Sequence, residues 1–319
     1  MQVITLEDIQ KMVSFPAAIE VVRKAFIAFS EGLIEQPIPM QILFTDEEGQ
    51  FTGDCHVKAA QKKQHPYFAI KIASGFYKNV EKGLPPNNGL VVVMSAETGL
   101  PVALLQDEGW LTNVRTAAAG TLAASLVSIS TEACLGLIGT GTQAFLHAQL
   151  MSQRFGLKKV AVLGRSLEKS QRFCLRLSDE LGLDATAMTS AHDVCHASRV
   201  VVTATPSIEP VIRAEDLPRQ LHIVAVGTDS PGKSEIDPSV TARADIIVTD
   251  NHHQCLHHGD FGNAVRVGAV AEDADISLCD LLAGKHPDLD FSEAKITLVD
   301  LTGMGAQDLA MAGLVADHL

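Results

Sequence analysis

A short stretch in the middle of the chain has the residue types and spacing of a phosphate-binding turn. The apolar run Cys134–Ile138 passes into Gly139-Thr-Gly141-Thr-Gln-Ala144, and a helical pattern then continues to Phe155. Gly139 can adopt the dihedral angles of a tight turn, Gly141 lets a pyrophosphate approach the backbone, and the helix N-terminus offers N–H groups to the phosphates. The strand–turn–helix context makes these glycines more specific than the pattern alone. We therefore predict a dinucleotide-binding domain that begins in the middle of the chain.

The residues after the next predicted strand bear on which dinucleotide is bound. Domains that bind NAD usually carry an acidic residue there, about 20 residues past the glycines, which holds the ribose hydroxyls. Here the strand Lys158–Leu163 is followed by Gly164-Arg165-Ser166. A cation and a hydroxyl suit a 2′-phosphate, so we predict NADP(H) in preference to NAD(H). The alternative is that Arg165 stacks on the adenine or is solvated.

Further apolar runs at Arg199–Ala204, Leu221–Val226 and Ala244–Thr249 alternate with helical or loop segments, including a helix over Ser166–Leu181. This alternation predicts a parallel sheet covered on both faces, as in a Rossmann-type domain. We expect the cofactor contacts to come from the glycine turn and from the ends of the following strands: Gly139, Thr140, Gly141, Thr142, Gln143, Arg165, Ser166, Thr203, Thr205, Val226 and Gly227.

The first third of the chain has a different character. The capping box Thr5–Asp8 opens a short predicted helix, and Phe15–Gly32 reads as a longer amphipathic one. Strands are predicted at Gln41–Phe44, Tyr67–Ala73, Leu90–Met94 and Pro101–Leu105, an Ala-rich helix at Thr112–Ser128, and a helical tail at Gly305–Leu319. The simplest architecture is an α/β fold in which a Rossmann-type NAD(P)-binding domain, residues 119–303, is inserted into an α+β domain, residues 1–118 and 304–319.

Composition limits the class of protein. The 319 residues are 46% hydrophobic and 20% charged, with a formal net charge of −13. The acidic balance argues against nucleic acid and anionic membranes as partners. The N-terminus lacks a signal-peptide pattern, and no apolar run approaches the roughly 18 residues that span a bilayer. The six cysteines are scattered without a Cys-x-x-Cys pair, so we expect reduced thiols and a cytoplasmic protein.

Several long blocks, in order along nearly the whole chain, resemble the ornithine cyclodeaminase/μ-crystallin family. They are Phe68–Tyr77, Gly83–Pro85, Ser95–Pro101, Leu111–Gly120, Gly139–Ala144, Val226–Glu235 and Gly303–Ala310. The resemblance implies a nicotinamide cofactor, a small amino or imino acid as substrate, and a homodimer formed through the non-nucleotide domain.

Three charged residues match the catalytic pattern of that family. The resemblance implies that Arg115 clamps the substrate carboxylate, because a guanidinium forms two parallel charge-assisted hydrogen bonds with it. Lys71, in an apolar strand, would face the same pocket and bind the carboxylate or a reacting nitrogen or oxygen. Asp229, after an apolar strand, would exchange a proton with the substrate amine. The structural alternatives are a snorkelling Lys71, a helix-capping Arg115 and an Asp229 that only shapes a turn.

The chain also departs from the family pattern. The arginine that many members carry after the second helix is missing from Gln36–Gln41, and Pro86-Asn87-Asn88 replaces a threonine after the Gly-Leu-Pro turn. The lysine-serine pair of the C-terminal loop is replaced within Val299–Gly303, which argues against ornithine. Lys58 can supply the missing cation, although a solvated strand lysine is the favoured interpretation. Asn87 offers an amide to the substrate.

Other segments resemble a less defined branch of the family. His56-Val-Lys58, the Gly-Phe-Tyr segment, Arg115 with its Ala-rich continuation and Gln254-Cys255 are similar to ectoine-utilisation cyclodeaminase-like proteins and cis-3-hydroxyproline dehydratases. The His-rich stretch Asn251–Asp260 raises the question of a metal. Its histidines and cysteine fall on different faces of a helix, so we predict a polar helix and no metal site.

Together these features predict an oxidoreductase that moves hydride between NAD(P)H and the Cα of a small imino or amino acid, like a ketimine or pyrroline-2-carboxylate reductase. One alternative is a redox-neutral cyclodeaminase, or a hydroxyproline-type dehydratase or ammonia-lyase. Another is a non-catalytic, μ-crystallin-like NADP(H)-binding protein. The presence of Lys71, Arg115 and Asp229 argues against that last class, because binding alone needs no acid–base group.

Overall fold

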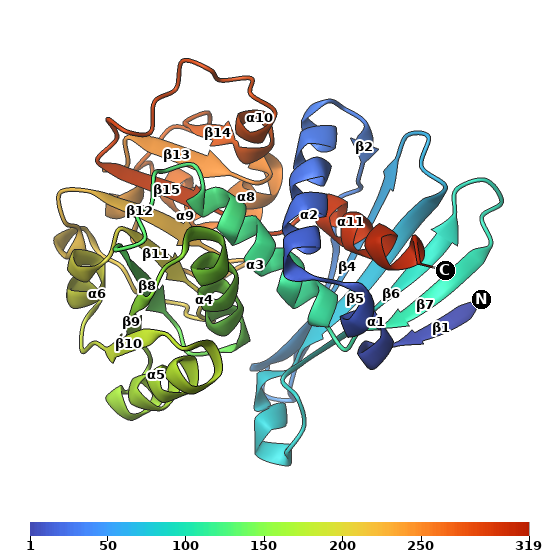
Figure 1. Cartoon of the computed structure of the whole chain (residues 1–319), viewed down its shortest axis with the longest axis horizontal. Helices are drawn as coiled ribbons and strands as arrows, with labels where there is room; N and C mark the ends of the chain where they lie inside the picture. The colour runs from blue at the N-terminus through green and yellow to red at the C-terminus, as the bar shows by residue number, and fades with distance from the viewer. Residues whose placement is uncertain (319) are drawn as a thin grey trace. The chain divides into compact units, whose positions relative to one another are not determined.

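Two separate β-sheets organise the chain, one in each of its two compact units (Figure 1). The computed structural model describes residues 1–318, with Tyr77 described by its backbone only. The mixed-sheet unit is Met1–Arg115 together with the chain from Met304 onward, and the parallel-sheet unit is Thr116–Gly303. The predicted fold class, a Rossmann-like parallel sheet combined with an α+β part, is confirmed.

The sheet of the mixed-sheet unit is largely antiparallel. Its strands are β1 (Gln2–Thr5), β2 (Ile34–Glu35), β3 (Met40–Thr45), β4 (Phe51–Lys62), β5 (Tyr67–Gly75), β6 (Asn87–Ser95) and β7 (Pro101–Gln106). They follow the order β1-β7-β6-β5-β4-β2, with β3 paired to β4, and only the β1–β7 pair is parallel. The strands predicted at Gln41, Tyr67, Leu90 and Pro101 are all present.

The helices of this unit are α1 (Leu6–Met12), α2 (Phe15–Ser30), the 3-10 turn η1 (Tyr77–Lys82) and α11 (Gly305–Ala316). Thr5 caps α1 by accepting a hydrogen bond from the Asp8 N–H, as the capping box predicts. Helix α11 packs on β4 and β5 and against α2 and is buried along almost its whole length. Of the predicted tail helix, Leu319 lies outside the described residues.

Helix α3 (Trp110–Ala124) carries the chain from the mixed-sheet unit into the parallel-sheet unit. It ends four residues before the predicted Ser128: the N–H groups of Leu126 and Val127 donate to carbonyls three residues back, and the Ser125 hydroxyl donates to the carbonyl of Leu122 at 2.6 Å. Such local serine hydrogen bonds compete with the helical pattern.

All strand pairs of the second sheet are parallel. Its strands are β8 (Cys134–Ile138), β9 (Lys159–Leu163), β10 (Asp184–Ala187), β11 (Val200–Thr203), β12 (Leu221–Ala225), β13 (Ile246–Thr249), β14 (Asp275–Ser277) and β15 (Ile296–Asp300). The order is β10-β9-β8-β11-β12-β15-β13-β14. The first five strands reproduce the 3-2-1-4-5 order of doubly wound folds, in which ligands bind where the order reverses, here between β8 and β11.

The helices of the parallel-sheet unit are α4 (Thr142–Phe155), α5 (Leu167–Leu181), α6 (Ala191–Ala197), the 3-10 turn η2 (Ala214–Asp216), α7 (Pro238–Thr241), α8 (His252–His258), α9 (Asp260–Arg266) and α10 (Leu278–Leu282). One expectation was wrong: Val299 and Asp300 end the buried strand β15, and only the residues after them form a loop. Strands β10, β14 and β15 were not predicted; in β10 and β14, runs of four and three residues carry too little periodicity.

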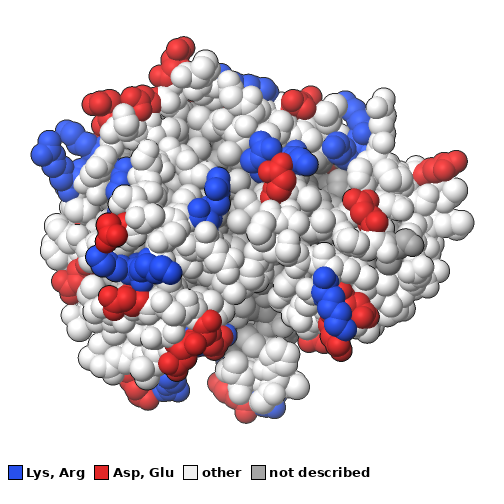
Figure 2. Space-filling view, viewed as in Figure 1, with Lys and Arg blue, Asp and Glu red and all other residues white. Residues whose placement is uncertain are grey.

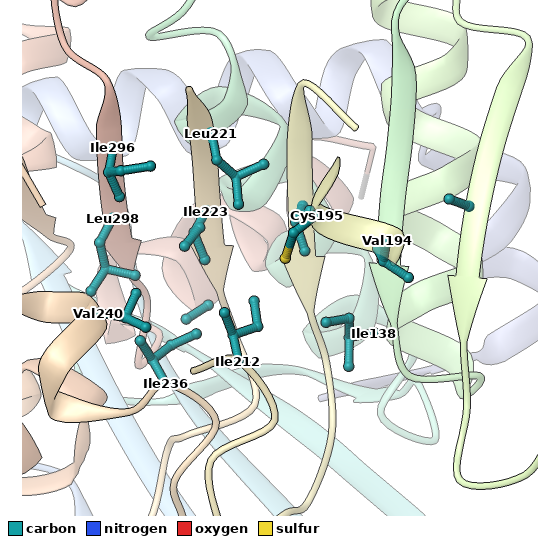
Figure 3. Packing of buried hydrophobic residues seen from close by; sticks show 13 residues of the cluster. Ile138, Val194, Cys195, Ile212, Leu221, Ile223, Ile236, Val240, Ile296 and Leu298 are labelled. Atoms are coloured by element: carbon teal, nitrogen blue, oxygen red, sulfur yellow. The ribbon is translucent and has the colours of Figure 1, made fainter. Parts of the chain in front are cut away.

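One apolar core fills a face of the parallel sheet (Figure 3). Leu221, Ile223 and Ala225 alternate along β12 and point into it together, while Ile296 and Leu298 do so from β15. Such alternation follows from the two-residue period of a strand. On the other face of β12, the His222 ring lies between Thr297 and the carbonyl of Ala123, and burial lowers the pKa of His222 to about 4.

Acidic and basic side chains are interspersed on the face drawn in Figure 2. Charged residues of α5 form helical pairs, namely Arg172 with Glu168 at 2.7 Å and Arg176 with Glu180 at 2.8 Å. Among the helices that the structure describes, none is long and apolar enough to cross a membrane.

Candidate active site

Two lysines face each other across neighbouring strands of the mixed-sheet unit. Lys58 on β4 and Lys71 on β5 are directly paired in register, so their side chains lie on the same face of the sheet. They are only 7% and 3% exposed. The interpretation of Lys58 as a solvated lysine was therefore wrong, because β4 is an interior strand that is covered by α11 at this face.

Asp308 of α11 is the counter-ion of this cluster. Its Oδ2 lies 3.3 Å from the Lys71 Nζ, and its Oδ1 lies 3.2 Å from the Arg115 Nε. Burial alone would raise the pKa of Asp308, but the positive charges of Lys71, Arg115 and Lys58 outweigh it and hold the pKa below its usual value. Asp308 is therefore ionised and shared between cations from two different elements.

Arg115 reaches this cluster from helix α3. Its Nη1 donates to the Gln307 Oε1 at 3.0 Å, and the same oxygen accepts from the Met304 N–H. Buried Asp107 fixes the start of α3 by accepting a hydrogen bond from the Leu111 N–H at 2.8 Å. The guanidinium is thus held by side chains on both of its edges, which is the way a carboxylate clamp is oriented before its ligand arrives.

Asn87 lies further along the sheet. It begins β6 opposite Gly75, four residues beyond Lys71 on β5, and its side chain is exposed. Four strand residues span about 13 Å. The structure therefore brings Lys58, Lys71, Arg115 and Asp308 together and leaves Asn87 apart from them. Sequence reasoning gave Asp308 no role, although a carboxylate inside an otherwise buried, apolar helix is a signal that it is paired.

In the parallel-sheet unit, the glycine turn has the predicted form. Gly139, at the end of β8, has φ of +124°, and a Cβ there would lie 2.5 Å from the carbonyl oxygen of Ala204 after β11. Gly141 caps α4 without a side chain, and a Cβ on it would meet nothing within 4 Å. Thr142 and Gln143 follow as the first residues of α4, and Thr140 packs against Gly164. The turn thus leaves open space at the switch point of the sheet.

Arg165 and Ser166 follow β9, as predicted. Arg165 is exposed, and the Ser166 hydroxyl accepts a hydrogen bond from the Lys169 N–H and so caps α5. The hydroxyl therefore already has a structural role, while the guanidinium lies at the surface next to the same helix N-terminus.

The ends of β11 and β12 meet on one buried carboxylate, Glu235. The hydroxyls of Thr203 and Thr205 and the backbone N–H groups of Thr205 and Gly227 all donate to it. Burial, followed by the charge of nearby Asp260, raises the pKa of Glu235 to about 7. Three of the predicted cofactor residues are thus engaged with Glu235, which sequence reasoning did not single out. Val226 beside them is buried.

Asp229 stands in the loop after β12 and is half-exposed. Its Oδ1 accepts a hydrogen bond from the Lys233 Nζ at 2.6 Å in the next turn of the chain. A carboxylate with one cationic neighbour and an accessible edge can both take up and return a proton.

The His-rich segment forms the predicted helix α8, although it is not polar throughout, since Gln254 and Cys255 are buried. His252 Nδ1 lies 2.8 Å from the Asp275 carboxylate. Within residues 1–318, no group of three or more His, Cys, Asp or Glu side chains is arranged to hold a metal ion.

Known proteins resemble this chain in both sequence and structure. An uncharacterized cyclodeaminase of Sinorhizobium fredii is 32% identical over 98% of this chain and 94% of its own length. The structure of an archaeal alanine dehydrogenase dimer with bound NAD superposes with a TM-score of 0.89 at 29% identity, covering 99% of this chain and 95% of the other. The Δ1-pyrroline-2-carboxylate reductase of Thermococcus litoralis, in complex with NADH and L-proline, gives a TM-score of 0.90 at 25% identity, with 99% and 97% coverage.

The family model that describes ornithine cyclodeaminase and mu-crystallin matches residues 1–319, the full length of the chain. The resemblance of the sequence blocks, the order of the strands and the superposed structures agree with this match. The chain belongs to the ornithine cyclodeaminase/mu-crystallin family.

Proposed function

We propose that this chain is an NAD(P)-dependent oxidoreductase that interconverts a small amino acid and the corresponding imino acid. The observation that carries the proposal is the buried cluster in which Asp308 holds Lys71 and Arg115. Burying several charged side chains is costly unless they serve one another or a ligand. The relatives that resemble this chain along its whole length include an alanine dehydrogenase and a pyrroline-2-carboxylate reductase.

In this proposal, residues 1–118 and 304–319 bind the substrate. Arg115 and Lys71 hold its carboxylate, and Lys58 supplies the cation that the sequence lacks after the second helix. The register of Lys58 and Lys71 supports this, because it presents both ammonium groups on one face. Asn87 remains a proposed contact for the part of the substrate furthest from the carboxylate.

Residues 119–303 bind the cofactor, which supplies or accepts a hydride when it is bound. Gly139, Gly141 and the first turn of α4, with Thr140, Thr142 and Gln143, fit a pyrophosphate, because a Cβ would clash at the first glycine and open space lies beside the second. Arg165, next to Ser166, favours NADP(H) by offering its charge to a 2′-phosphate. The two relatives described above hold NAD and NADH, so this preference rests on the residues after β9. Asp229 exchanges a proton with the substrate nitrogen, and Lys233 orients its carboxylate by donating a hydrogen bond to Oδ1.

A second candidate is redox-neutral chemistry, namely cyclisation with loss of ammonia, or loss of water from a hydroxylated proline. The identity with an uncharacterized cyclodeaminase favours it, as do the segments that resemble the ectoine-utilisation and cis-3-hydroxyproline branch. The same carboxylate clamp and proton-transfer residue serve both reactions, so only the product separates them.

We further propose that the active form is a homodimer built on the mixed-sheet unit. Strand β3 exposes Met40, Ile42, Leu43 and Phe44, which are 55%, 43%, 55% and 39% exposed. A run of exposed apolar side chains on one strand is typical of a protein–protein interface. The cytoplasmic location also stays a proposal, and the six cysteines, none of which forms a disulfide, support it.

The test is nicotinamide absorbance after the protein is mixed with NADPH or NADH and pyrroline-2-carboxylate, piperideine-2-carboxylate or pyruvate with ammonia. Asp229→Asn should abolish turnover and leave cofactor binding intact, whereas Asp179→Asn, an exposed acid on α5, should behave like the wild type. Release of ammonia or water without net change in NADPH would replace the reductase with the second candidate. Cofactor binding without turnover of any substrate would identify a binding protein instead.

A further inference from the structure

The carboxylate of Glu235 joins two loops that leave the sheet at neighbouring strands. Its Oε1 accepts hydrogen bonds from the Thr205 N–H at 2.6 Å and the Thr205 hydroxyl at 2.7 Å. Its Oε2 accepts from the Thr203 hydroxyl and the Gly227 N–H, both at 2.8 Å. Each carboxylate oxygen therefore accepts two hydrogen bonds, one for each of its lone pairs.

The surrounding backbone is shaped to this carboxylate. A Cβ on Gly227 would lie 2.6 Å from the carboxyl carbon of Glu235 and 2.3 Å from the carbonyl oxygen of Thr205. Glycine is required there because the carboxylate and the loop after β11 occupy the space of a side chain. The contact is thus built into both loops, and one of them continues directly to Asp229.

Acidic groups surround Glu235 from the other elements packed against it. Asp260, at the start of α9, accepts hydrogen bonds from the N–H groups of Glu235 and Ile236 at 2.9 and 3.1 Å. Asp300, at the end of β15, accepts from the Phe261 N–H at 2.9 Å, and its pKa is raised by burial and by the charges of Asp260, Asp250 and Glu235. Burial and the charge of Asp260 raise the pKa of Glu235 to about 7, so its protonation changes within the physiological range.

We propose that Glu235 is a positioning residue for the dinucleotide: its carboxylate holds the loops after β11 and β12 in the binding geometry, and its protonation releases them. A proton on either oxygen removes one acceptor position, so one of the four donors loses its partner. Thr205 and Gly227 donate through backbone groups that move only with their loops. The inference rests on the proposed function, because it requires that this unit bind a dinucleotide.

Three residues that the sequence predicts as cofactor contacts have a different role in this proposal. The donors of Thr203, Thr205 and Gly227 are directed at Glu235, so these residues shape the binding surface and do not donate to the cofactor. The phosphate-binding role then falls on the glycine turn after β8.

The experiment is a fluorescence titration of the whole protein with NADH and NADPH at pH 6, 7 and 8. If protonation of a group with pKa of about 7 opposes binding, the apparent Kd rises about tenfold from pH 8 to pH 6. NADH is the decisive ligand, because a 2′-phosphate itself titrates near pH 6 and would affect NADPH alone.

Glu235→Gln should bind both nucleotides weakly and without this pH dependence, since an amide presents only one acceptor oxygen to the four donors. Glu209→Gln, an exposed glutamate on the loop after β11, should retain the wild-type profile. Thr205→Val, which removes one hydroxyl donor and leaves the carboxylate, should move the midpoint of the NADH profile to higher pH. If circular dichroism shows that Glu235→Gln does not fold, Thr205→Val tests the proposal in its place.

A pH-independent NADH affinity of the wild type would overturn the inference, as would a Glu235→Gln or Thr205→Val protein with the wild-type profile. Failure of the wild type to bind either nucleotide at any pH would instead overturn the proposed function, and this inference with it. The two failures are therefore distinguished by the wild-type titration at pH 8.

Discussion

Asp308 and Glu235 are both deeply buried carboxylates, yet their surroundings shift their pKa values in opposite directions. Asp308 lies among Lys71, Arg115 and Lys58, and those charges lower its pKa against the effect of burial. Glu235 lies beside Asp260, and burial together with that charge raises its pKa to about 7. Burial alone therefore does not decide whether a carboxylate is ionised; the charges that the fold brings next to it do.

The two acids also suit different tasks. A carboxylate that stays ionised keeps several cations in place, as a substrate clamp requires. A carboxylate that titrates near neutral pH can tie a loop geometry to protonation.

The largest effect is expected from Asp308→Asn. Removing the charge leaves buried cations without their shared counter-ion, which typically costs about 3–5 kcal/mol of unfolding free energy. We expect a lower midpoint in urea denaturation and a loss of turnover of at least about 100-fold. Asp317→Asn, at the exposed end of the same helix, is the matched control. A change in unfolding free energy below about 1 kcal/mol would mean that Asp308 does not hold the cluster.

The pH dependence of this contribution has a defined sign. Because the pKa of Asp308 is lower in the folded state than in the unfolded state, its contribution is present above the unfolded pKa and is lost as pH falls through the folded one. The stability difference between the wild type and Asp308→Asn should therefore shrink in acid.

Glu235→Gln should show the opposite sign. A folded-state pKa of about 7 against an ordinary value of 4.5 means that the folded protein binds the extra proton, so stability falls as pH rises between these values. A shift of this size corresponds to about 3 kcal/mol. Denaturation at pH 5 and pH 8 should show a smaller loss of stability in the variant than in the wild type or Glu209→Gln.

An unchanged slope in Glu235→Gln would assign the pH dependence to Asp260 and Asp300, whose pKa values are also raised by burial. The difference would then lie between the cationic cluster around Asp308 and the acidic cluster of Glu235, Asp260 and Asp300, and not between Asp308 and Glu235 alone.

A smaller effect is expected from Lys58→Met. The charge of Lys58 is the third of the cationic influences on Asp308, so its loss weakens the clamp without removing the ion pairs of Lys71 and Arg115. We expect the KM for a carboxylate substrate to rise about tenfold, or 1.4 kcal/mol, with a smaller change in kcat. Lys62→Met, on the same strand and paired with Ile34, is the control. An unchanged KM would show that Lys58 only supports Asp308.

The contrast between these regions also explains what could be predicted from the sequence. The turn at Gly139 and the cap at Thr5 were predictable, because the residue types that signal each of them lie within a few positions of one another. The contact of Arg115 with Asp308 joins residues 193 positions apart, and that of Glu235 with Thr203 spans 32 positions. Pairings of this kind exist only once the fold brings the elements together.

The error at Lys58 has a related cause. A lysine in a strand with polar neighbours such as His56 and Gln61 resembles an exposed residue. Its burial follows from two non-local facts, namely that β4 lies between other strands and that α11 packs over it. Asp54 on the same strand is likewise buried. For Lys58 the sequence indicates only a strand with polar neighbours, whereas the coverage comes from helix α11 at the end of the chain.

The smallest expected effect concerns a charge that is not buried at all. Arg165 is exposed beside the N-terminus of α5, so solvent would screen its proposed interaction with a 2′-phosphate and reduce its contribution. Arg165→Ala should weaken NADPH binding about tenfold, leave NADH binding nearly unchanged, and lose most of its effect in high salt. Arg172→Ala, an exposed arginine on the same helix paired with Glu168, is the control. Equal loss for both nucleotides would mean that Arg165 stacks on the adenine. In either case the loss of binding should be smaller than the loss of turnover in Asp308→Asn. Solvent screens the exposed charge of Arg165, whereas the buried charges around Asp308 are screened much less.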